Sequence, residues 1–431
     1  MTWLRLAVAN LRLSPLSSAV NVVLMGLGTA SIVLLLLAGA QLAETLSRDA
    51  RGVDLVLGAN GSPVQLVLAA VYHADIPPGN IDQQEADRWA SDPRVGSAIP
   101  LSLGDSYQGF RIVGTTEAYA GLYAAHLAAG RFWRDPMEAV AGATAAELAG
   151  LEAESRFAGA HGLAAGGHKH QSQLYRVVGV LEPTGTVIDR LILTSLESVW
   201  ALHGEEQSPA HVAHADHQEE HGHEDDHLSG HAHDDDHHHQ DHPDSGHTDA
   251  RREITAMLIQ YRSPLAAMTF PREVAASGSL QAAAPAVVIS RILQLVGIGL
   301  DGLKMFSGVL ILTAALSVFA ALYGSLRARR GDLAMLRCLG ATRWELFWAL
   351  LLEGLLLSIC GVALGFLVGH GVMALLGGWL ESARGVALTG WTWLPAETFL
   401  LVGLFGVGVV AAAIPAVQAY RTDVARTLAQ G

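Results

Sequence analysis

Histidine, aspartate and glutamate dominate one stretch of the chain, from His203 to His247, which holds 14 of the 20 histidines. Neutral imidazoles and carboxylates bind Zn²⁺, Ni²⁺, Cu²⁺ and Co²⁺ alike. With almost no large apolar residue, 203–249 is expected to be disordered and to bind divalent metal weakly at several sites, although it could instead be a solvated acidic linker. The candidate ligands in this tract are His203, His221, His223, His227, His237, His238 and His239.

Three further histidines, His161, His168 and His170, precede an expected strand in a glycine-rich segment. On an extended chain His168 and His170 share one face, so with His203 they could form a folded metal site. The alternative is that all three are solvated loop residues. No cofactor is required by either interpretation.

Two short motifs suggest catalysis but lack the required context. His223 to His227 matches H-E-x-x-H, which needs a stable helix to align its histidines, and this tract has no apolar face. Gly297 to Gly302 matches G-x-G-x-x-G without a preceding strand. No G-x-x-x-x-G-K-(S/T) occurs, so any ATP must be hydrolysed by another subunit. We therefore expect no catalytic residue and no enzyme activity in this chain.

A short basic segment, Arg327 to Arg343, lies between two long apolar runs. Leucines recur through it at near-helical spacing, and Gly340 is placed to end a short helix. A positive-inside anchor would explain the arginines, whereas a surface that docks a cytosolic partner explains both the arginines and the leucines. The candidate coupling residues are Arg327, Arg329, Arg330, Leu333, Leu336, Arg337, Leu339, Gly340, Arg343 and Glu353.

Four apolar runs are each long enough to cross a bilayer, which needs about 20 residues per helix. Their basic flanks fall on one side, which the positive-inside rule places in the cytoplasm. The first run could be a cleaved signal peptide, but its apolar core is longer than usual, and we expect an anchor. Glycines 361, 365 and 369 form a face of small residues along one helix. This face could pack within one subunit or form the contact of a dimer, and the sequence does not favour either.

The expected organisation is a membrane protein of four transmembrane helices with a large external α+β domain between helices 1 and 2. Net charge is −14, but 203–249 holds 14 of the 41 acids and the remainder is neutral. The expected parts are a cytoplasmic N-terminus (1–18), transmembrane helices (19–43, 305–326, 346–376, 397–420), a periplasmic domain (44–290), a stalk (291–304), a cytoplasmic coupling helix (327–345), a short external loop (377–396) and a cytoplasmic tail (421–431).

Within the external domain, strands are expected over 107–115, 174–181, 190–194 and 254–261, and short helices over 81–91 and 139–150. The uncharged segments 55–72 and 277–290 contain glycine or proline and are assigned to this domain. An apolar stripe from Ile292 to Leu303 is expected to run into the second membrane helix. Neither cysteine, Cys338 or Cys360, falls in this domain, so no disulfide is expected there.

The motif Arg-x-Arg-Arg-x-Asp-x-Ala-x-Leu-Arg-x-Leu-Gly-Ala-Thr from Arg327, followed by Glu353-Gly354, resembles the signature of the FtsX-like permease family, as does the closing segment from Ile414 to Leu428. Segments Val177–Leu181 and Gly130–Phe132 resemble the family's MacB-like periplasmic core domain. The resemblance is strongest over the C-terminal third.

This resemblance implies the permease subunit of an ABC transporter of the MacB or LolC type in the bacterial inner membrane. It implies a second permease subunit, two cytosolic ATPase subunits, mechanotransmission to the external domain, and contact with a periplasmic protein or lipoprotein. Nucleic acid is not an expected partner. The metal-ligand tract suggests a zinc-linked role. The alternative is a non-transporting regulator or scaffold that controls an envelope partner such as a hydrolase.

Overall fold

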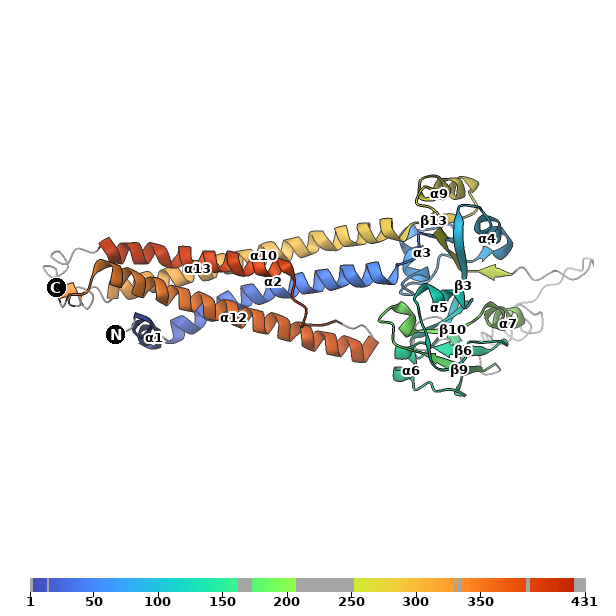
Figure 1. Cartoon of the computed structure of the whole chain (residues 1–431), viewed down its shortest axis with the longest axis horizontal. Coiled ribbons are helices and arrows are strands. Elements are labelled where there is room, and N and C mark those ends of the chain that lie inside the picture. The colour runs from blue at the N-terminus through green and yellow to red at the C-terminus, as the bar shows by residue number, and fades with distance from the viewer. Residues whose placement is uncertain are drawn as a thin grey trace, which may run out of the picture. The chain divides into compact units, whose positions relative to one another are not determined.

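The computed structural model describes residues 3–13, 15–161, 173–206, 252–328, 331, 335, 337–338, 340–384 and 388–421 (Figure 1). The chain divides into two compact units. A helical unit combines Met1–Ser47 with Ile289–Gly431, and a second unit is formed by Arg48–Val288. The segment between the first and second long helices therefore folds as a domain of its own.

Among the described residues, four helices are long and apolar enough to cross a membrane. They are α2 (Pro15–Asp49), α10 (Pro285–Ala328), α12 (Arg343–Arg384) and α13 (Pro395–Arg421). The stripe from Ile292 to Leu303 lies in the same unbroken helix as the second span, as expected. Residues 285–290, which we assigned to the external domain, form the start of α10, because proline fits the first helical turn, and those up to Val288 belong to the second unit.

Glycines of α12 pack against α2 of the same chain. A Cβ at Gly361 would lie 2.6 Å from the Cβ of Met25, one at Gly365 would lie 2.4 Å from that of Thr29, and Gly369 lies against Val33. Small residues at every fourth position allow two membrane helices to approach closely. Of the two alternatives left open by the sequence, the structure therefore supports packing within one subunit.

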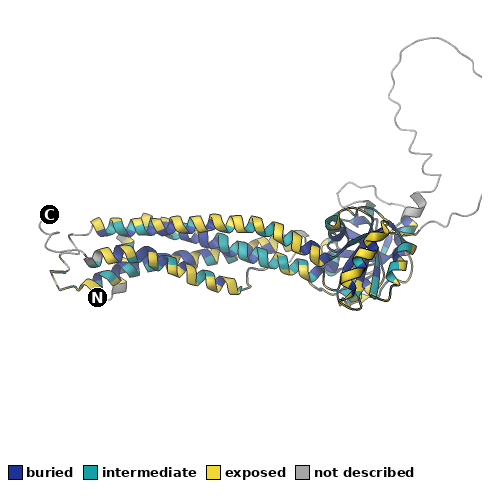
Figure 2. Cartoon of the chain, turned by 90° about the horizontal axis from the view of Figure 1, so that it is seen from above, coloured by how far each residue is buried: buried dark blue, intermediate teal, exposed yellow. Residues whose placement is uncertain are grey.

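The bundle buries narrow apolar stripes and exposes the remaining faces of its helices (Figure 2). One cluster joins Val318 and Leu322 of α10 to Leu357 of α12 and Ala412 of α13. Large apolar side chains such as Phe306, Leu367 and Phe399 are exposed. An exposed apolar surface of this kind is suited to lipid, where backbone groups are satisfied inside each helix.

The domain formed by Arg48–Val288 contains an 11-stranded mixed sheet with the strand order β13-β1-β12-β3-β4-β10-β6-β9-β5, and with β7 and β8 paired beside β9 and β3. Strands β2 and β11 form a separate pair. The pairs β10–β4 and β6–β9 are parallel, and the other strand pairs are antiparallel. The strands are β1 (Leu55–Gly58), β2 (Ile81–Asp82), β3 (Val95–Tyr107), β4 (Phe110–Thr115), β5 (Leu127–Gly130), β6 (Glu138–Ala141), β7 (Arg156–Phe157), β8 (Ala160–His161), β9 (Tyr175–Leu181), β10 (Leu191–Ser195), β11 (Glu253–Ile254), β12 (Ala256–Tyr261) and β13 (Gln281–Ala283).

Two buried clusters occupy the two halves of this domain. One gathers around Phe270, Leu57 and Ile259, and the other around Tyr175, Phe157 and Ile112. Strand β3 belongs to both halves, because its first part pairs with β12 and its second part with β4. The helices are α3 (Pro63–Ala70), α4 (Gln83–Ala90), α5 (Ala118–Leu122), α6 (Ala143–Ala149), α7 (Leu196–Glu206) and α9 (Ala266–Ser277), with a 3₁₀ turn over Val187–Arg190.

The expected strands over 174–181 and 190–194 are confirmed as β9 and β10. The expected strand over 107–115 is wrong in part. It is a hairpin whose two turn residues, Gln108 and Gly109, have φ of 49° and 88°, as a two-residue type I′ turn requires. The expected helix over 139–150 is also wrong in part, because Glu138–Ala141 is a buried strand and only Ala143–Ala149 is helical.

Candidate functional site

Several arginines of the basic segment lie where the long helices end. Arg327 is exposed in the last turn of α10, and Arg343 is exposed at the first position of α12. Arg337 is half-buried between them. We call this part of the helical unit, from Arg327 to Arg343, the basic end.

The chain turns sharply at the basic end before α12 begins. Gly340 has φ of 104°, and its amide donates to the Arg337 carbonyl over 3.1 Å. The backbone amide of Thr342 donates to Glu345 Oε2 over 2.6 Å, and the Glu345 amide donates to Thr342 Oγ1 over 3.3 Å. This reciprocal pair is a capping box. It fixes the start of α12 and hence the position of Arg343.

The structure does not bring all the predicted coupling residues together in the described part of the chain. Arg329, Arg330, Leu333, Leu336 and Leu339 lie outside the described residues. The apolar face predicted from the leucines therefore stays a prediction.

Glu353, the last predicted coupling residue, is buried with 4% of its surface exposed. The next residue, Gly354, lies where a Cβ would meet Ala412 of α13 and Leu322 of α10. Three helices therefore meet at this level, and the Glu353 carboxylate is inside the bundle rather than on a surface that a partner could reach.

Aromatic side chains surround the basic end. The rings of Trp344 and Tyr420 lie 5.2 Å apart, and Trp344 also contacts Phe347. Trp344 and Trp348 are each at least half exposed. Tryptophan and tyrosine beside arginine are typical of a membrane–water interface.

One helix at this end was not predicted from the sequence, α1 (Trp3–Leu13), which packs against α12 (Figure 1). Its Ala7 is buried and Leu11 joins a bundle cluster, whereas Arg5 and Arg12 are exposed. Apolar residues at helical spacing with arginines on the other face were the available signal. An amphipathic helix of this kind suits the plane of a membrane interface.

In the external domain, the last residue of α2, Asp49, is hydrogen-bonded into the fold. Its Oδ1 accepts from the Val187 amide over 3.2 Å, and its backbone carbonyl accepts from the Tyr123 hydroxyl over 3.0 Å. Arg190 Nη2 lies 3.8 Å from Asp49 Oδ2. The residue that ends the first long helix is thus fixed to the domain by contacts from two other segments.

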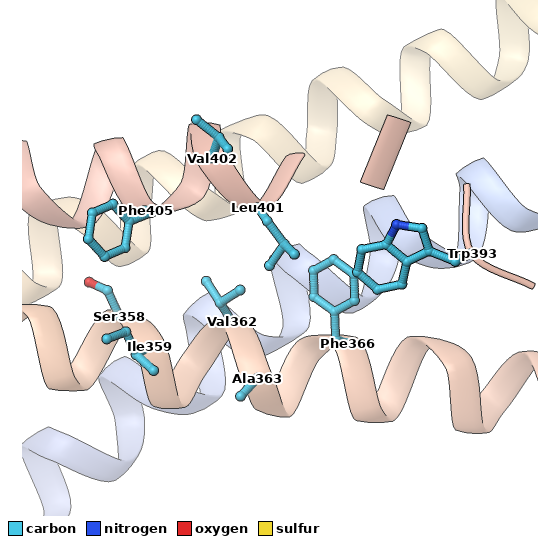
Figure 3. A pocket seen from close by; sticks show the side chains of 9 residues that line it. All are labelled: Ser358, Ile359, Val362, Ala363, Phe366, Trp393, Leu401, Val402 and Phe405. Atoms are coloured by element: carbon cyan, nitrogen blue, oxygen red, sulfur yellow. The ribbon is translucent and has the colours of Figure 1, made fainter. Parts of the chain in front are cut away.

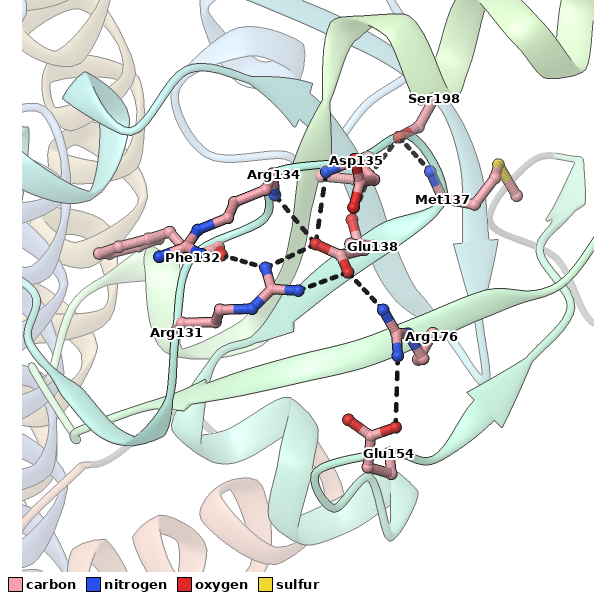
Figure 4. A network of polar contacts seen from close by, with 10 residues as sticks. Arg131, Phe132, Arg134, Asp135, Met137, Glu138, Glu154, Arg176 and Ser198 are labelled. Atoms are coloured by element: carbon pink, nitrogen blue, oxygen red, sulfur yellow. Dashed lines mark hydrogen bonds and ion pairs between the residues drawn. The ribbon is translucent and has the colours of Figure 1, made fainter.

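A buried carboxylate, Glu138 at the start of β6, joins polar groups of several segments (Figure 4). Both of its oxygens accept from the Arg131 guanidinium at 2.6 Å, and Oε1 also accepts from Arg176 at 2.5 Å. The Arg134 amide donates to Oε2 over 2.9 Å. These hydrogen bonds, with Arg131 foremost, lower the pKa of Glu138 to about 2. The charged carboxylate is therefore part of the folded domain.

His73 is also buried in this domain and has φ of 53°. Its Nε2 lies 2.8 Å from the hydroxyl of Tyr119. Burial, followed by the charges of Arg111 and Arg190, lowers the pKa of His73 to about 3. The imidazole is therefore neutral at physiological pH and is held in the core beside the Tyr119 ring.

The candidate metal ligands lie mostly outside the described residues. His161 ends β8 and His203 lies in α7, but the other eight candidates are not in the described ranges. Within the described ranges, no group of three or more histidine, cysteine, aspartate or glutamate side chains could hold a metal ion. Metal binding by the tract stays a prediction.

An apolar pocket of about 520 Å³ opens between α12 and α13 (Figure 3). Phe366 and Trp393 stand close together at one end of it, and Phe405 lines the other. Ser358 is the hydroxyl residue in its lining. Its composition suits hydrocarbon.

Comparisons with known proteins match two parts of the chain. Residues 304–424 match the FtsX-like permease C-terminal model, and residues 18–218 match the MacB-like periplasmic core domain model. An uncharacterized ABC transporter permease protein of Mycobacterium tuberculosis is 35% identical over 107 residues, which are 23% of this chain and 12% of that protein.

Two solved structures are similar to the external region. The periplasmic region of MacB from Actinobacillus actinomycetemcomitans is 10% identical, with a TM-score of 0.32, over 56% of this chain and 95% of that one. The extracellular domain of the noncanonic ABC-type transporter YknZ from Gram-positive bacteria is 11% identical, with a TM-score of 0.29, over 53% of this chain and 98% of that one.

Proposed function

Because the chain belongs to the FtsX-like permeases and has a MacB-like periplasmic core domain, we propose that it couples ATP hydrolysis by a partner subunit to movement of its external domain. It would act as the membrane subunit of an ABC transporter in the bacterial inner membrane, with both termini and the basic end in the cytoplasm. The ATPase would be a separate cytosolic subunit that docks on the basic end, and a second permease subunit would complete the transporter.

The continuity of α10 is the observation that supports coupling most directly. This helix has 44 residues, which gives a length of about 66 Å, more than twice the bilayer core of about 30 Å. It begins directly after β13 of the external domain and ends at Arg327 and Ala328 of the basic end. It has no proline after its first residue, so a displacement at one end can be transmitted along it.

The end of α2 supports the same proposal. Asp49 is tied to Val187, Tyr123 and Arg190, so movement of this helix would be passed to the domain through hydrogen bonds rather than through a slack linker.

Charge reversal at the basic end tests the coupling role. Arg337→Glu and Arg343→Glu should each lower co-purification of the ATPase by about tenfold or more, because each removes a cationic contact and, if the groove of the ATPase is acidic, creates a like-charge clash. Leu336→Asp, on the predicted apolar face, should do the same by placing a charge in a desolvated contact. The measurements are the yield of ATPase bound to the purified permease and ATPase activity in nanodiscs.

Lys304→Glu is the matched control, because Lys304 is a partly exposed cation of α10 outside the basic end. It should leave partner binding unchanged. If the three basic-end variants retain the ATPase and its stimulation like the parent, the segment is only a topological anchor.

The metal-linked part of the proposal rests on the composition of 203–249. Deleting 205–249 should leave expression and membrane insertion intact and remove most of the weak zinc binding seen by calorimetry of the full chain. A variant with the histidines of the tract replaced by asparagine keeps its length and acids and should lose the same binding, since imidazole is the preferred nitrogen ligand. Unchanged zinc stoichiometry in both variants would identify the tract as a linker.

A further inference from the structure

Two ionisable side chains, His370 of α12 and Glu397 of α13, meet inside the helical unit. His370 Nε2 lies 3.5 Å from Glu397 Oε2, and Glu397 has no exposed surface. His370 lies about 40 Å along α12 from Arg343, so the pair is far from the basic end. Ionisable groups inside a membrane span are costly, and a functional role is the default hypothesis for them.

The hydrogen bond made by His370 determines which of its two ring nitrogens carries a hydrogen. Its Nδ1 lies 2.7 Å from the carbonyl oxygen of Gly390, which can only accept, so Nδ1 carries a hydrogen. Nε2 therefore carries one only when the imidazole is charged. Nε2 and both Glu397 oxygens are buried without a hydrogen-bond partner.

A neutral imidazole facing an ionised Glu397 would leave a buried charge opposite a lone pair, which is strongly unfavourable. One additional proton removes this conflict. It can sit on Nε2, giving an ion pair, or on the carboxyl group, which then donates to Nε2. Either arrangement requires the pair to hold one proton in the conformation that the structure shows.

Aromatic rings and a cavity adjoin the imidazole. The Trp393 ring stacks on His370 at 6.3 Å and the Phe366 ring at 5.9 Å, and the two aromatic rings also stack on each other (Figure 3). Stacked rings favour a cationic imidazole. A mostly apolar cavity of about 520 Å³, lined by His370, Trp391 and Thr392 among others, opens beside the imidazole.

Among the described side chains near this pair, the polar ones beside His370, such as Thr392, carry no charge. Phe366, which stacks on His370, belongs to an apolar cluster that includes Val33 and Met373. The nearest charged positions along the neighbouring helices are Glu44 of α2, Glu381 of α12, and Asp301 and Lys304 of α10, which pair with each other at 2.9 Å.

The pair also holds the segment 388–394 in place. Its Gly390 accepts from His370, and its Thr389 exchanges two backbone hydrogen bonds with the Gln41 side chain, at 2.6 and 2.8 Å. A Cβ at Gly390 would lie 2.3 Å from the His370 carbonyl oxygen, so the segment is in close contact with α12.

We propose that His370 and Glu397 form a one-proton binding site whose occupancy keeps the segment 388–394 packed on α12. Loss of the proton leaves the buried carboxylate without a partner, and the segment separates so that water can reach it. The site binds a proton rather than a metal ion, because two side chains alone do not supply the four ligands usual for zinc.

Cysteine labelling of the full chain in nanodiscs tests this site. Both native cysteines, Cys338 and Cys360, are first replaced by serine. The labelling rate of Leu388→Cys then reports whether the segment is packed. The labelling rate of Trp391→Cys, at a position 92% exposed, corrects for the effect of pH on the reactivity of the thiol itself. The ratio of the two labelling rates should rise at least about fivefold between about pH 5.5 and about pH 8.5, since a coupled proton changes a population by up to tenfold per pH unit.

Glu397→Gln should remove this dependence, because its amide donates to Nε2 at every pH and keeps the ratio low. Glu381→Gln, which removes an exposed carboxylate from α12, is the matched control and should behave like the parent. If Glu397→Gln does not fold, the fluorescence difference between the parent and Trp393→Phe should show a pH step, because separation of the segment 388–394 moves the Trp393 indole away from the imidazole, whichever group carries the proton.

A flat ratio in the parent, an equal rise in Glu397→Gln, or a fluorescence difference independent of pH would overturn the proposal. A change produced by added Zn²⁺ at constant pH, but not by pH, would also overturn it and assign the pair to a metal.

Discussion

At Glu138, one carboxylate receives hydrogen bonds from two arginines and from the backbone. Its pKa is lowered from 4.5 to about 2, mainly by Arg131, so the folded domain binds this proton less tightly than the unfolded chain does. The stabilisation of the folded domain by the ionised Glu138 carboxylate is therefore complete above about pH 4.5 and is lost as the pH falls towards 2.

Glu138→Gln should lower the free energy of unfolding of the external domain by about 3 kcal/mol at neutral pH. The difference from the parent should shrink as the pH falls below about 4.5. Thermal unfolding of the full chain in detergent at pH 7 and pH 3 measures both values. Glu154→Gln is the control, because Glu154 is 72% exposed and should contribute less than about 1 kcal/mol. An effect of Glu138→Gln that did not depend on pH would contradict the assigned cause.

The glycine face of α12 gives a second test at the scale of single residues. Gly365→Ala places a methyl group 2.4 Å from the Thr29 Cβ and 2.6 Å from the Gly26 carbonyl, so it should destabilise the bundle by about 1–3 kcal/mol. Gly371→Ala, on the same helix with no atom within 4 Å, should be neutral or slightly stabilising. Thermal stability of the purified chain distinguishes the two. Equal effects would mean that α12 does not pack on α2 through this face.

At the scale of elements, the four long helices could be predicted because uncharged runs of this length have few other structures available. The error over 139–150 arose because a short apolar run such as Ala139 to Ala141 fits a buried strand as well as a helix. Strand β3 was not predicted, since Pro100 and Gly104 interrupt its pattern.

The contact between His370 and Glu397 could not be predicted for a different reason. His370 is an isolated histidine in a long apolar run, and its partner lies on the next helix. Local periodicity identifies the face of a helix but not the residue that opposes it. The same limit applies to Gly361, Gly365 and Gly369, whose spacing showed a packing face but not that α2 occupies it.

At the scale of the whole molecule, charge and topology can be considered together. The described arginines Arg5, Arg12, Arg327, Arg337 and Arg343 all lie at the ends of helices that the positive-inside rule assigns to the cytoplasm. Without the acidic tract the remaining acids and bases balance, so we expect the asymmetry of arginine, rather than net charge, to set the orientation.

Labelling of intact cells with a membrane-impermeant maleimide tests this orientation. Ser279→Cys, at an exposed position of the external domain, should react in intact cells, whereas the exposed native Cys338 of the basic end should react only after lysis. Ser106, also in the external domain, is buried and would be a poor labelling position. Cys360→Ser removes the second native thiol, and Cys338→Ser in the same background is the control that assigns the signal.

Reaction of Cys338 in intact cells, with protection of Ser279→Cys, would reverse the topology. It would place the basic end where no cytosolic ATPase could reach it, and the coupling proposal would be wrong.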